Sequence, residues 1–445
     1  MSKLSTRKIL ALIFIFTIVI RFVFVVFAYK DNQIERYADD KNYLTYAESV
    51  LEKGPFVFDN QPDIVKIVGP VLPWIIAVMI LVFGKSWLHV YILNAVIGSI
   101  TCILIYYLGK EVFNRKVGLF AAWWSAIYIL FIKYVPSSGK DIWLIFFFTL
   151  YIYIFLKQRK NQNMISGSLV SGLIFSLMIH LDERYFAYFP LFLLFMILLD
   201  NVNWKIGLKK AAIFFLAVII LMIPWLIRNY RAYGRIVILT SRTTVFTDKL
   251  LGYERLPAYH ELKFGGNRWY INPAQIDSVV SMGTNVRMRS GRPISDDQVV
   301  AMQAGIIPKP MSRLEKYWSA LNNLWQPIDL KNSYFHTGYR FDGKWSLKHN
   351  LGVGLTYGML LPFFFLGLLK LVKTQPKLGI FFISILVLHT LIHILFIVFT
   401  RNRYRIPIDP LIIITAFSGF LAWLRKTGSE ISVSNPGNIL SGITN

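Results

Sequence analysis

The sequence predicts an all-α protein that crosses a membrane many times. Its mean hydropathy is +0.50, 55% of its 445 residues are hydrophobic, and only 16% are charged. A soluble protein of this length is far more polar. Several apolar runs approach or exceed the roughly 20 residues that a helix needs to cross a bilayer. Together these observations predict a polytopic bundle of helices.

The apolar runs predict about ten transmembrane helices. One further run, 70–83, is too short to cross comfortably, because about 14 helical residues extend only ~21 Å. This run contains Pro70 and Pro73, and we expect it to lie at the membrane interface on the outer side. The predicted spans are 9–29, 87–108, 117–134, 142–156, 164–181, 185–199, 211–227, 351–371, 378–399 and 406–424.

The spans divide the chain into four parts. Residues 1–227 form an N-terminal membrane module with a long first outer loop at 30–86. Residues 228–350 form an outer region of irregular and helical structure, 351–424 supply the last helices, and 425–445 form a tail. Lysine and arginine flank the spans mostly on one side. The positive-inside rule places that side, both termini included, in the cytoplasm.

The charge and the cysteine content exclude several classes of function. The net charge is +24, but no nucleic-acid motif accompanies it, so lipid headgroups and lipid phosphates are the expected partners. The single cysteine, Cys102, excludes a disulfide within the chain. No cofactor is expected, and a divalent metal is possible but not expected. His389 and His393 are expected to form hydrogen bonds inside the bundle rather than to hold a metal.

An acidic pair, Asp39 and Asp40, follows the first span directly. Carboxylates at the edge of a bilayer are costly because their surroundings desolvate them, which favours a functional role. A carboxylate held near an attacking hydroxyl can accept its proton. The alternative is that the pair caps a helix beginning near Lys41, since aspartate is common at that position.

Three stretches together resemble the GT-C superfamily of integral-membrane glycosyltransferases. They are 38–43 in the first outer loop, 223–230 at the end of a span, and 403–410 before the last span. The resemblance is to the branch of the lipid A aminoarabinose transferase and the protein O-mannosyltransferases, and it covers about 21–424. It implies a GT-C bundle with a short interfacial helix and an outer cap.

The resemblance also implies roles for particular residues. In the family, an Asp-Glu pair occupies the first outer loop, and its aspartate acts as a base or orients the acceptor. Asp39 matches that aspartate, whereas Asp40 replaces the glutamate. A lysine ahead of the short helix contacts the donor phosphate, as Lys66 would here, and Arg228 would be a second phosphate ligand. The other expected substrate-binding residues are Tyr43, Lys140, Asp141, Arg184, Arg403 and Arg405.

Several of these residues have a purely structural alternative. Lys66 could be a solvated loop lysine, and Arg228 could anchor the end of a span among lipid headgroups. Lys140 and Asp141 could belong to a helix cap. The turn 182–184 is expected to contain a local ion pair.

The expected activity is the transfer of a sugar from a polyprenyl phosphate donor to an acceptor lipid, glycan or protein. We expect a monomer in the bacterial inner membrane, with its site on the outer face and cations that stabilise the leaving phosphate. Two other classes stay open. A lipid-linked sugar transporter or flippase would typically contain paired repeats, and none is detected. A polysaccharide polymerase or O-antigen ligase would depend on outer-loop arginines and histidines without the early acidic pair.

Overall fold

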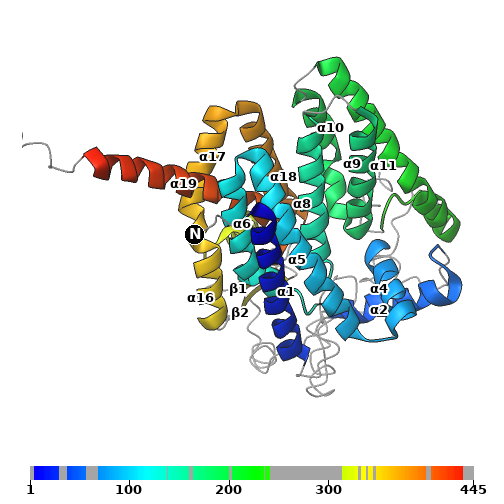
Figure 1. Ribbon diagram of the computed structural model, residues 1–445. Coiled ribbons are helices and arrows are strands. Elements are labelled where there is room, and N and C mark those ends of the chain that lie inside the picture. Colours follow the sequence, from blue (N-terminus) through cyan, green and yellow to red (C-terminus); the bar gives the residue numbers. More distant parts are fainter. Residues whose placement is uncertain are drawn as a thin grey trace, which may run out of the picture.

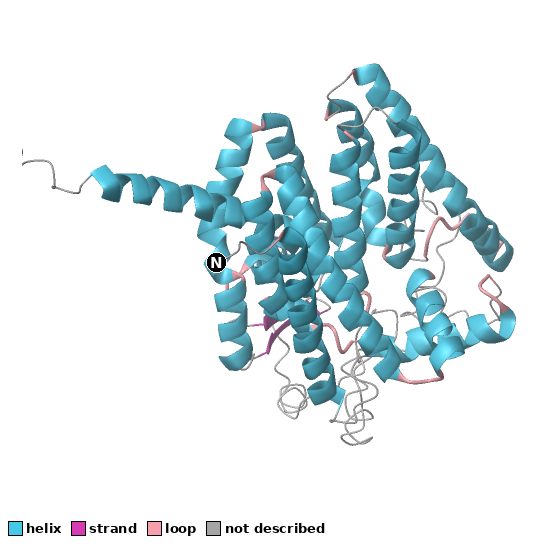
Figure 2. Ribbon diagram, in the orientation of Figure 1, coloured by secondary structure: helices cyan, strands magenta, loops and turns pink. Residues whose placement is uncertain are grey.

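The computed structural model describes residues 5–29, 38–56, 69–137, 139–159, 164–199, 203–234, 236–240, 313–328, 332–336, 339–343, 347–396 and 402–433. This part of the chain is a bundle of α-helices with one short pair of strands (Figures 1 and 2). Seven of its helices are long and apolar enough to cross a membrane. The predicted all-α polytopic class is confirmed. The number of about ten spans stays a prediction, because some apolar helices are shorter.

The N-terminal half supplies most of the bundle. Its helices, in chain order, are α1 (Thr6–Tyr29), α2 (Ala38–Lys53), α4 (Val71–Phe83), α5 (Trp87–Val112), α6 (Arg115–Ile127), α7 (Ile129–Lys133), α8 (Asp141–Gln158), α9 (Met164–Leu181), the 3₁₀ helix η1 (Glu183–Tyr188), α10 (Phe189–Leu198) and α11 (Trp204–Tyr233).

The C-terminal half completes the bundle and contains the strands. Its elements are α15 (Arg313–Trp325), β1 (Asn332–His336), β2 (Tyr339–Gly343), α16 (Leu347–Thr356), η4 (Gly358–Leu360), α17 (Leu361–Thr374), α18 (Pro376–Phe396), η5 (Asn402–Tyr404), η6 (Ile406–Ile408) and α19 (Asp409–Val433). The strands pair antiparallel, from Asn332 opposite Gly343 to His336 opposite Tyr339. This hairpin was not predicted for the outer region.

Polar residues fix several helix boundaries. The side chains of Ser86, Asn114 and Asn203 accept hydrogen bonds from backbone N–H groups at the starts of α5, α6 and α11. These bonds satisfy donors that have no partner within their own helix. Gly234 ends α11 in the left-handed conformation, with φ of 66°, which glycine adopts without steric cost.

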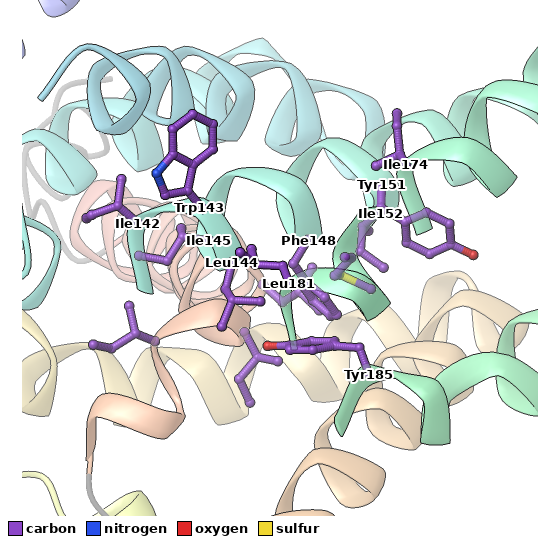
Figure 3. Packing of buried hydrophobic residues seen from close by; sticks show 14 of the residues in the cluster. Ile142, Trp143, Leu144, Ile145, Phe148, Tyr151, Ile152, Ile174, Leu181 and Tyr185 are labelled. Atoms are coloured by element: carbon purple, nitrogen blue, oxygen red, sulfur yellow. The ribbon is translucent and has the colours of Figure 1, made fainter. Parts of the chain in front are cut away.

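The core is built around α8, which packs against α5 and α9. Its apolar side chains, among them Phe148 and Tyr151, interdigitate with those of neighbouring helices (Figure 3). Leu181, the last residue of α9, and Tyr185 in η1 belong to the same core. Close packing in a membrane bundle depends on such complementary surfaces, since lipid tails are themselves apolar. The core therefore fixes the ends of α8 and α9 relative to each other.

The short helix α4 lies at one end of the bundle. It packs against α2, and both lie beyond the lower ends of α9 and α11 in Figure 1. Gly69, just before α4, approaches the end of α9 so closely that a Cβ atom there would lie 2.0 Å from the carbonyl oxygen of His180. The predicted short apolar helix at 70–83 is confirmed, and its place at the membrane interface stays a prediction.

The predicted span 117–134 is not one helix. α6 ends at Ile127, Tyr128 adopts an extended conformation with φ of −65° and ψ of 112°, and the short α7 follows. The chain then reaches Ser137 and, after one further residue, Gly139, Lys140 and the start of α8. This break directs the segment that leads into the candidate site described below.

Candidate active site

Two cations share one buried carboxylate at the ends of α8 and α9. The Lys140 ammonium lies 2.9 Å from Asp182 Oδ2. Arg184 binds the same carboxylate through two nitrogens: its Nε donates to Oδ1 at 2.7 Å, and its Nη2 contacts Oδ2. The predicted ion pair within 182–184 is confirmed. It is larger than predicted, because Lys140 joins it from 42 positions earlier in the chain.

A second ion pair lies beside the first and joins two distant segments. Arg403 Nε donates to both carboxylate oxygens of Asp141, at 2.9 and 3.0 Å, and Nη2 lies 2.8 Å from Oδ2. Gly139 makes this approach possible, because a Cβ atom there would lie 2.8 Å from Arg403 Nη2. Lys140 occupies the N-cap position of α8 without a side-chain capping bond. Ion pairing, rather than helix capping, therefore accounts for Lys140 and Asp141.

Charge and exposure are distributed unequally in this cluster of five residues, which we call the ionic cluster (Lys140, Asp141, Asp182, Arg184 and Arg403). The three cationic side chains are 18%, 20% and 24% exposed, whereas the carboxylates of Asp182 and Asp141 are 0% and 9% exposed. The carboxylates thus lie beneath and the cations above. Three positive charges face two negative ones, so the exposed side of the cluster carries a net positive charge.

The ion pairs shift the pKa values of Asp182 and Arg403. Burial alone would raise the pKa of Asp182, but Arg184 and Lys140 outweigh burial and hold the pKa of that carboxyl well below its usual range. Burial lowers the pKa of Arg403, yet Asp141 dominates and raises that pKa above its usual value. These groups therefore stay charged at every physiological pH.

Two histidines of α18 support Arg184. Arg184 Nη1 lies 3.2 Å from His393 Nε2, and His393 Nδ1 lies 2.7 Å from the carbonyl oxygen of His389. His389 Nε2 lies 2.8 Å from the carbonyl oxygen of Tyr404, while its Nδ1 lies 2.6 Å from the Tyr188 hydroxyl. Because a carbonyl can only accept, the proton belongs on Nδ1 of His393 and on Nε2 of His389. The prediction of hydrogen-bonded histidines is confirmed.

Asn94 of α5 holds the loop that carries the cluster. Its side-chain amide donates to the carbonyl oxygens of Val135 and Ser137, at 3.1 and 2.8 Å, and its Oδ1 accepts from Trp143 Nε1 at 3.1 Å. Because both the nitrogen and the oxygen of this amide form hydrogen bonds, Asn94 fixes the loop at Val135 and Ser137 relative to α5 and α8.

Arg228 lies at the end of α11, beside the same end of α9. It is buried, its Nη1 donates to Asn229 Oδ1 at 2.6 Å, and its guanidinium lies 5.0 Å from the centre of the Trp225 ring. That ring in turn meets His180 edge-on at 6.2 Å and Trp74 of α4 at 6.4 Å. Arg228 therefore belongs to a neighbouring group that α4 and α9 share.

The acidic pair lies on α2. This helix begins at Ala38 rather than near Lys41, so Asp39 and Asp40 occupy its first turn. The side chains of both aspartates lie outside the described part of the structure, and so does Lys66. Tyr43, one turn later, is buried.

Contacts fix α2 to α4. Trp74 Nε1 donates to the carbonyl oxygen of Pro55 at 3.2 Å, and Glu48 pairs with Lys85 just beyond α4. Since α4 also packs against α9, α2 lies one helix away from the end of α9 where Asp182 begins the cluster.

Arg405 is placed differently from the other predicted binding residues. Its side chain is fully buried, its Nε donates to Asp409 Oδ1 at 2.8 Å, and its Nη1 donates to the Leu324 carbonyl oxygen at 2.8 Å. The guanidinium stacks 3.3 Å from the centre of the Tyr357 ring. We therefore leave Arg405 out of the set proposed below to contact substrate.

Three residues of the candidate site were not predicted as site residues from the sequence. Asp182, Tyr404 and Asn94 were not among the predicted site residues, although Asp182 was expected in an ion pair. One signal was present in the sequence: Asn94 is a polar amide inside an apolar run, and such residues usually make a specific hydrogen bond. Nothing in the sequence indicates that a backbone carbonyl of Tyr404 orients His389.

Comparisons with known proteins agree with this architecture. The family model for dolichyl-phosphate-mannose-protein mannosyltransferases matches residues 67–227. This stretch contains α4, the loop of Lys140 and Asp141, and the turn of Asp182 and Arg184, but it begins after the acidic pair. No curated protein matches the chain in sequence.

Among solved structures, the chain is similar to the oligosaccharyltransferase of Archaeoglobus fulgidus. The apo form has a TM-score of 0.58 and 14% identity, and the alignment covers 98% of this chain and 52% of that one. The form titled as the AglB complex with an inhibitory peptide and a dolichol-phosphate has a TM-score of 0.50 and 15% identity, covering 89% and 47%. The chain thus spans about half the length of these structures.

The chain has the GT-C fold. The family match and the structural similarity both point to this superfamily, so the resemblance seen in the sequence is confirmed. The ionic cluster of this GT-C protein lies where several bundle helices end. Together these findings show a multi-pass helical membrane protein with this fold.

Proposed function

We propose that this protein transfers a sugar from a polyprenyl phosphate donor to an acceptor on the outer face of the bacterial inner membrane. One observation carries the proposal: Lys140, Arg184 and Arg403 present partly exposed cations above two buried carboxylates. Such a surface suits an anion that must bind, gain charge and leave. The cluster lies at an end of the bundle, where a lipid phosphate would reach it from the membrane.

The leaving group determines what the cations do. As the bond between the anomeric carbon and the phosphate oxygen breaks, the phosphate gains negative charge. Arginine presents a planar fork of donors that matches phosphate oxygens, and lysine adds a compact positive charge. Because the cations are already held in place by Asp141 and Asp182, little reorganisation is needed when charge develops. Arg228 and Lys66 are proposed as further phosphate ligands.

Asp39 is the proposed base. As the acceptor hydroxyl attacks the anomeric carbon, its proton passes to the Asp39 carboxylate, and the configuration at that carbon inverts. The position of α2 supports this role, because α2 packs on α4 and α4 packs on α9, whose end leads into the cluster. Asp40 and Tyr43 are proposed to help orient the acceptor or the sugar.

The compared proteins support a lipid-linked donor. The matched family is named for a dolichyl-phosphate-mannose donor, and one similar oligosaccharyltransferase structure is titled as a complex with dolichol-phosphate. Both names concern those proteins. They make a polyprenyl phosphate the first donor class to test here, and they leave the acceptor open among a lipid, a glycan and a protein.

Replacing Asp39 tests the base directly. The purified protein would be reconstituted in vesicles with a polyprenyl phosphate sugar and candidate acceptors. We expect Asp39→Asn to lower kcat by about 10²-fold or more, as expected for the loss of a general base. Asp40→Asn, one residue away in the same helical turn, is the matched control and should retain more activity. Full activity of Asp39→Asn would remove Asp39 from the mechanism.

The same vesicles separate the rival classes of function. A transferase releases free polyprenyl phosphate only when an acceptor is present. A flippase moves the intact donor between leaflets without breaking it. A polymerase or ligase requires a glycan acceptor and should not depend on Asp39. Release of sugar that depends on both the acceptor and Asp39 supports the proposal.

A further inference from the structure

Arg21 is an arginine inside the first membrane helix that the proposed mechanism does not use. It lies within the apolar stretch Thr6–Phe27 of α1, and its side chain is fully buried among neighbouring helices. Ionisable groups within a membrane span are rare, and they are retained where they have a specific partner or function. The groups that bind the Arg21 side chain therefore indicate what this residue does.

The partners of Arg21 include the last carbonyls of α6, together with the Cys102 thiol, whose Sγ lies 3.5 Å from Nη2. Nη2 lies 3.3 Å from the Ser125 carbonyl oxygen, and Nη1 lies 3.4 Å from that of Ala126. Nη1 also reaches the Thr17 carbonyl oxygen at 3.4 Å. The final carbonyls of a helix receive no hydrogen bond from an N–H group of that helix, and they form its negative end. Arg21 thus places a positive charge on the end of α6.

That helix end is the break that precedes the candidate site. Immediately after it, Tyr128 turns the chain, and its hydroxyl donates to Asp409 Oδ2 at 2.7 Å. The break is therefore held on one side by Arg21 and on the other by Asp409. The chain continues through α7 to Val135 and Ser137, whose carbonyls Asn94 holds.

We propose that Arg21 is a positioning residue for the candidate active site, acting through the break at Tyr128. By fixing the end of α6, it sets the direction in which the segment from Tyr128 to Ser137 leaves the bundle interior. That segment leads to Lys140 and Asp141, which hold Asp182 and Arg403. The activity readout rests on the proposed function, whereas the structural readout does not.

The geometry requires an arginine in particular. Its planar fork reaches the carbonyls of Ser125 and Ala126 with two different nitrogens, whereas a lysine offers a single charged atom. Gly98 on α5 provides the space, because a Cβ atom there would lie 3.0 Å from Arg21 Nε. Two mild substitutions, Arg21→Lys and Gly98→Ala, therefore disturb the same contact from different sides.

Hydrogen exchange of the full-length protein in vesicles tests the positioning role. We expect Arg21→Met to speed the exchange of backbone amides in the peptide spanning 128–137 by about tenfold, with Arg21→Lys and Gly98→Ala causing smaller increases. The matched control is Phe214→Leu, a buried change at the contact between α9 and α11 that touches neither the break nor the cluster. It should lower thermal stability without raising exchange in that peptide.

Kinetics supply the second readout. Contacts to a leaving phosphate strengthen in the transition state, so misplacing them should lower kcat about tenfold while changing the KM for the donor much less. Arg21→Lys should recover part of the lost kcat. Unchanged exchange at 128–137 in all three variants would overturn the inference even if the enzyme is active. Faster exchange in a protein with no transferase activity would instead retain the positioning role and contradict the proposed function.

Discussion

Two arginine–aspartate pairs, formed by arginines only two positions apart, behave differently in this protein. Arg403 pairs with Asp141 at the end of the bundle, and about a quarter of the arginine side chain is exposed. Arg405 pairs with Asp409 in the interior, where both side chains are almost completely buried. The chemical groups are the same, but water can reach only the first pair. Exposure therefore decides which arginine a ligand can reach.

The surroundings of each pair explain the difference. A partly exposed guanidinium can bind a phosphate on its exposed side while it stays paired with its carboxylate, because water can be displaced from that side. A buried guanidinium has no such exposed side, and removing one partner leaves an uncompensated charge in the interior. Arg405 also donates to the Leu324 carbonyl and stacks on Tyr357, which anchors the end of α15 to the bundle. We interpret it as structural.

The largest expected effect is on the stability of the buried pair. Arg405→Met should lower the free energy of unfolding by about 3–5 kcal/mol, because Asp409 is left buried without its cation. Thermal unfolding in detergent measures this loss, monitored as the fraction of the protein that remains monodisperse after heating. The double variant Arg405→Met with Asp409→Leu should recover much of it, since no isolated charge remains. Wild-type stability of the single variant would contradict our assignment of Arg405 as structural.

A smaller stability effect with a larger functional one is expected for the exposed pair. Arg403→Gln should cost about 1–2 kcal/mol of stability, less than Arg405→Met, because the glutamine amide can still donate a hydrogen bond to the largely buried Asp141. Under the proposed function, the same change should reduce kcat/KM for the lipid-linked donor by at least about tenfold, since one phosphate ligand is lost. Parallel melting curves and donor titrations measure the two effects. Equal losses of stability for Arg403→Gln and Arg405→Met would contradict the claim that the two pairs contribute differently to stability.

The smallest expected effect concerns pH. The folded-state pKa of Asp182 is well below its usual value, because Arg184 and Lys140 outweigh burial. The unfolded chain therefore takes up this proton first as pH falls, so the contribution of Asp182 to stability is fully present above about pH 4 and is lost below it. The difference in stability between the wild type and Asp182→Asn should be constant from about pH 5 to 8. A difference that shrinks between about pH 7 and 5 would show that the carboxylate is not held in this way.

Much of the fold could be predicted because it follows from local composition. Apolar runs of sufficient length specify helices in lipid, since a backbone in the membrane must satisfy its own hydrogen bonds. The short run at 70–83 was predicted as a separate short helix, and the structure confirms that helix. The break at Tyr128 was not predicted, because the surrounding residues are uniformly apolar and the partners that hold it, Arg21 and Asp409, are distant in sequence.

The candidate site was predictable only in part. Lys140, Asp141, Arg184 and Arg403 stood out as charged residues between apolar runs, and the structure brings them into one cluster. The same criterion selected Arg405, which is buried. The roles of Asp39, Asp40 and Lys66 stay predictions, because their side chains lie outside the described residues.

The sequence alone determined that this chain forms a helical membrane bundle with its charged residues gathered near helix ends. It could do so because hydrophobic length and charge placement are properties of each segment taken separately. Only the tertiary structure decided which charges meet, such as Arg403 with Asp141 across 262 positions, and which are sealed inside. An ion pair depends on a distance of a few ångströms between segments, and packing of the whole bundle sets that distance.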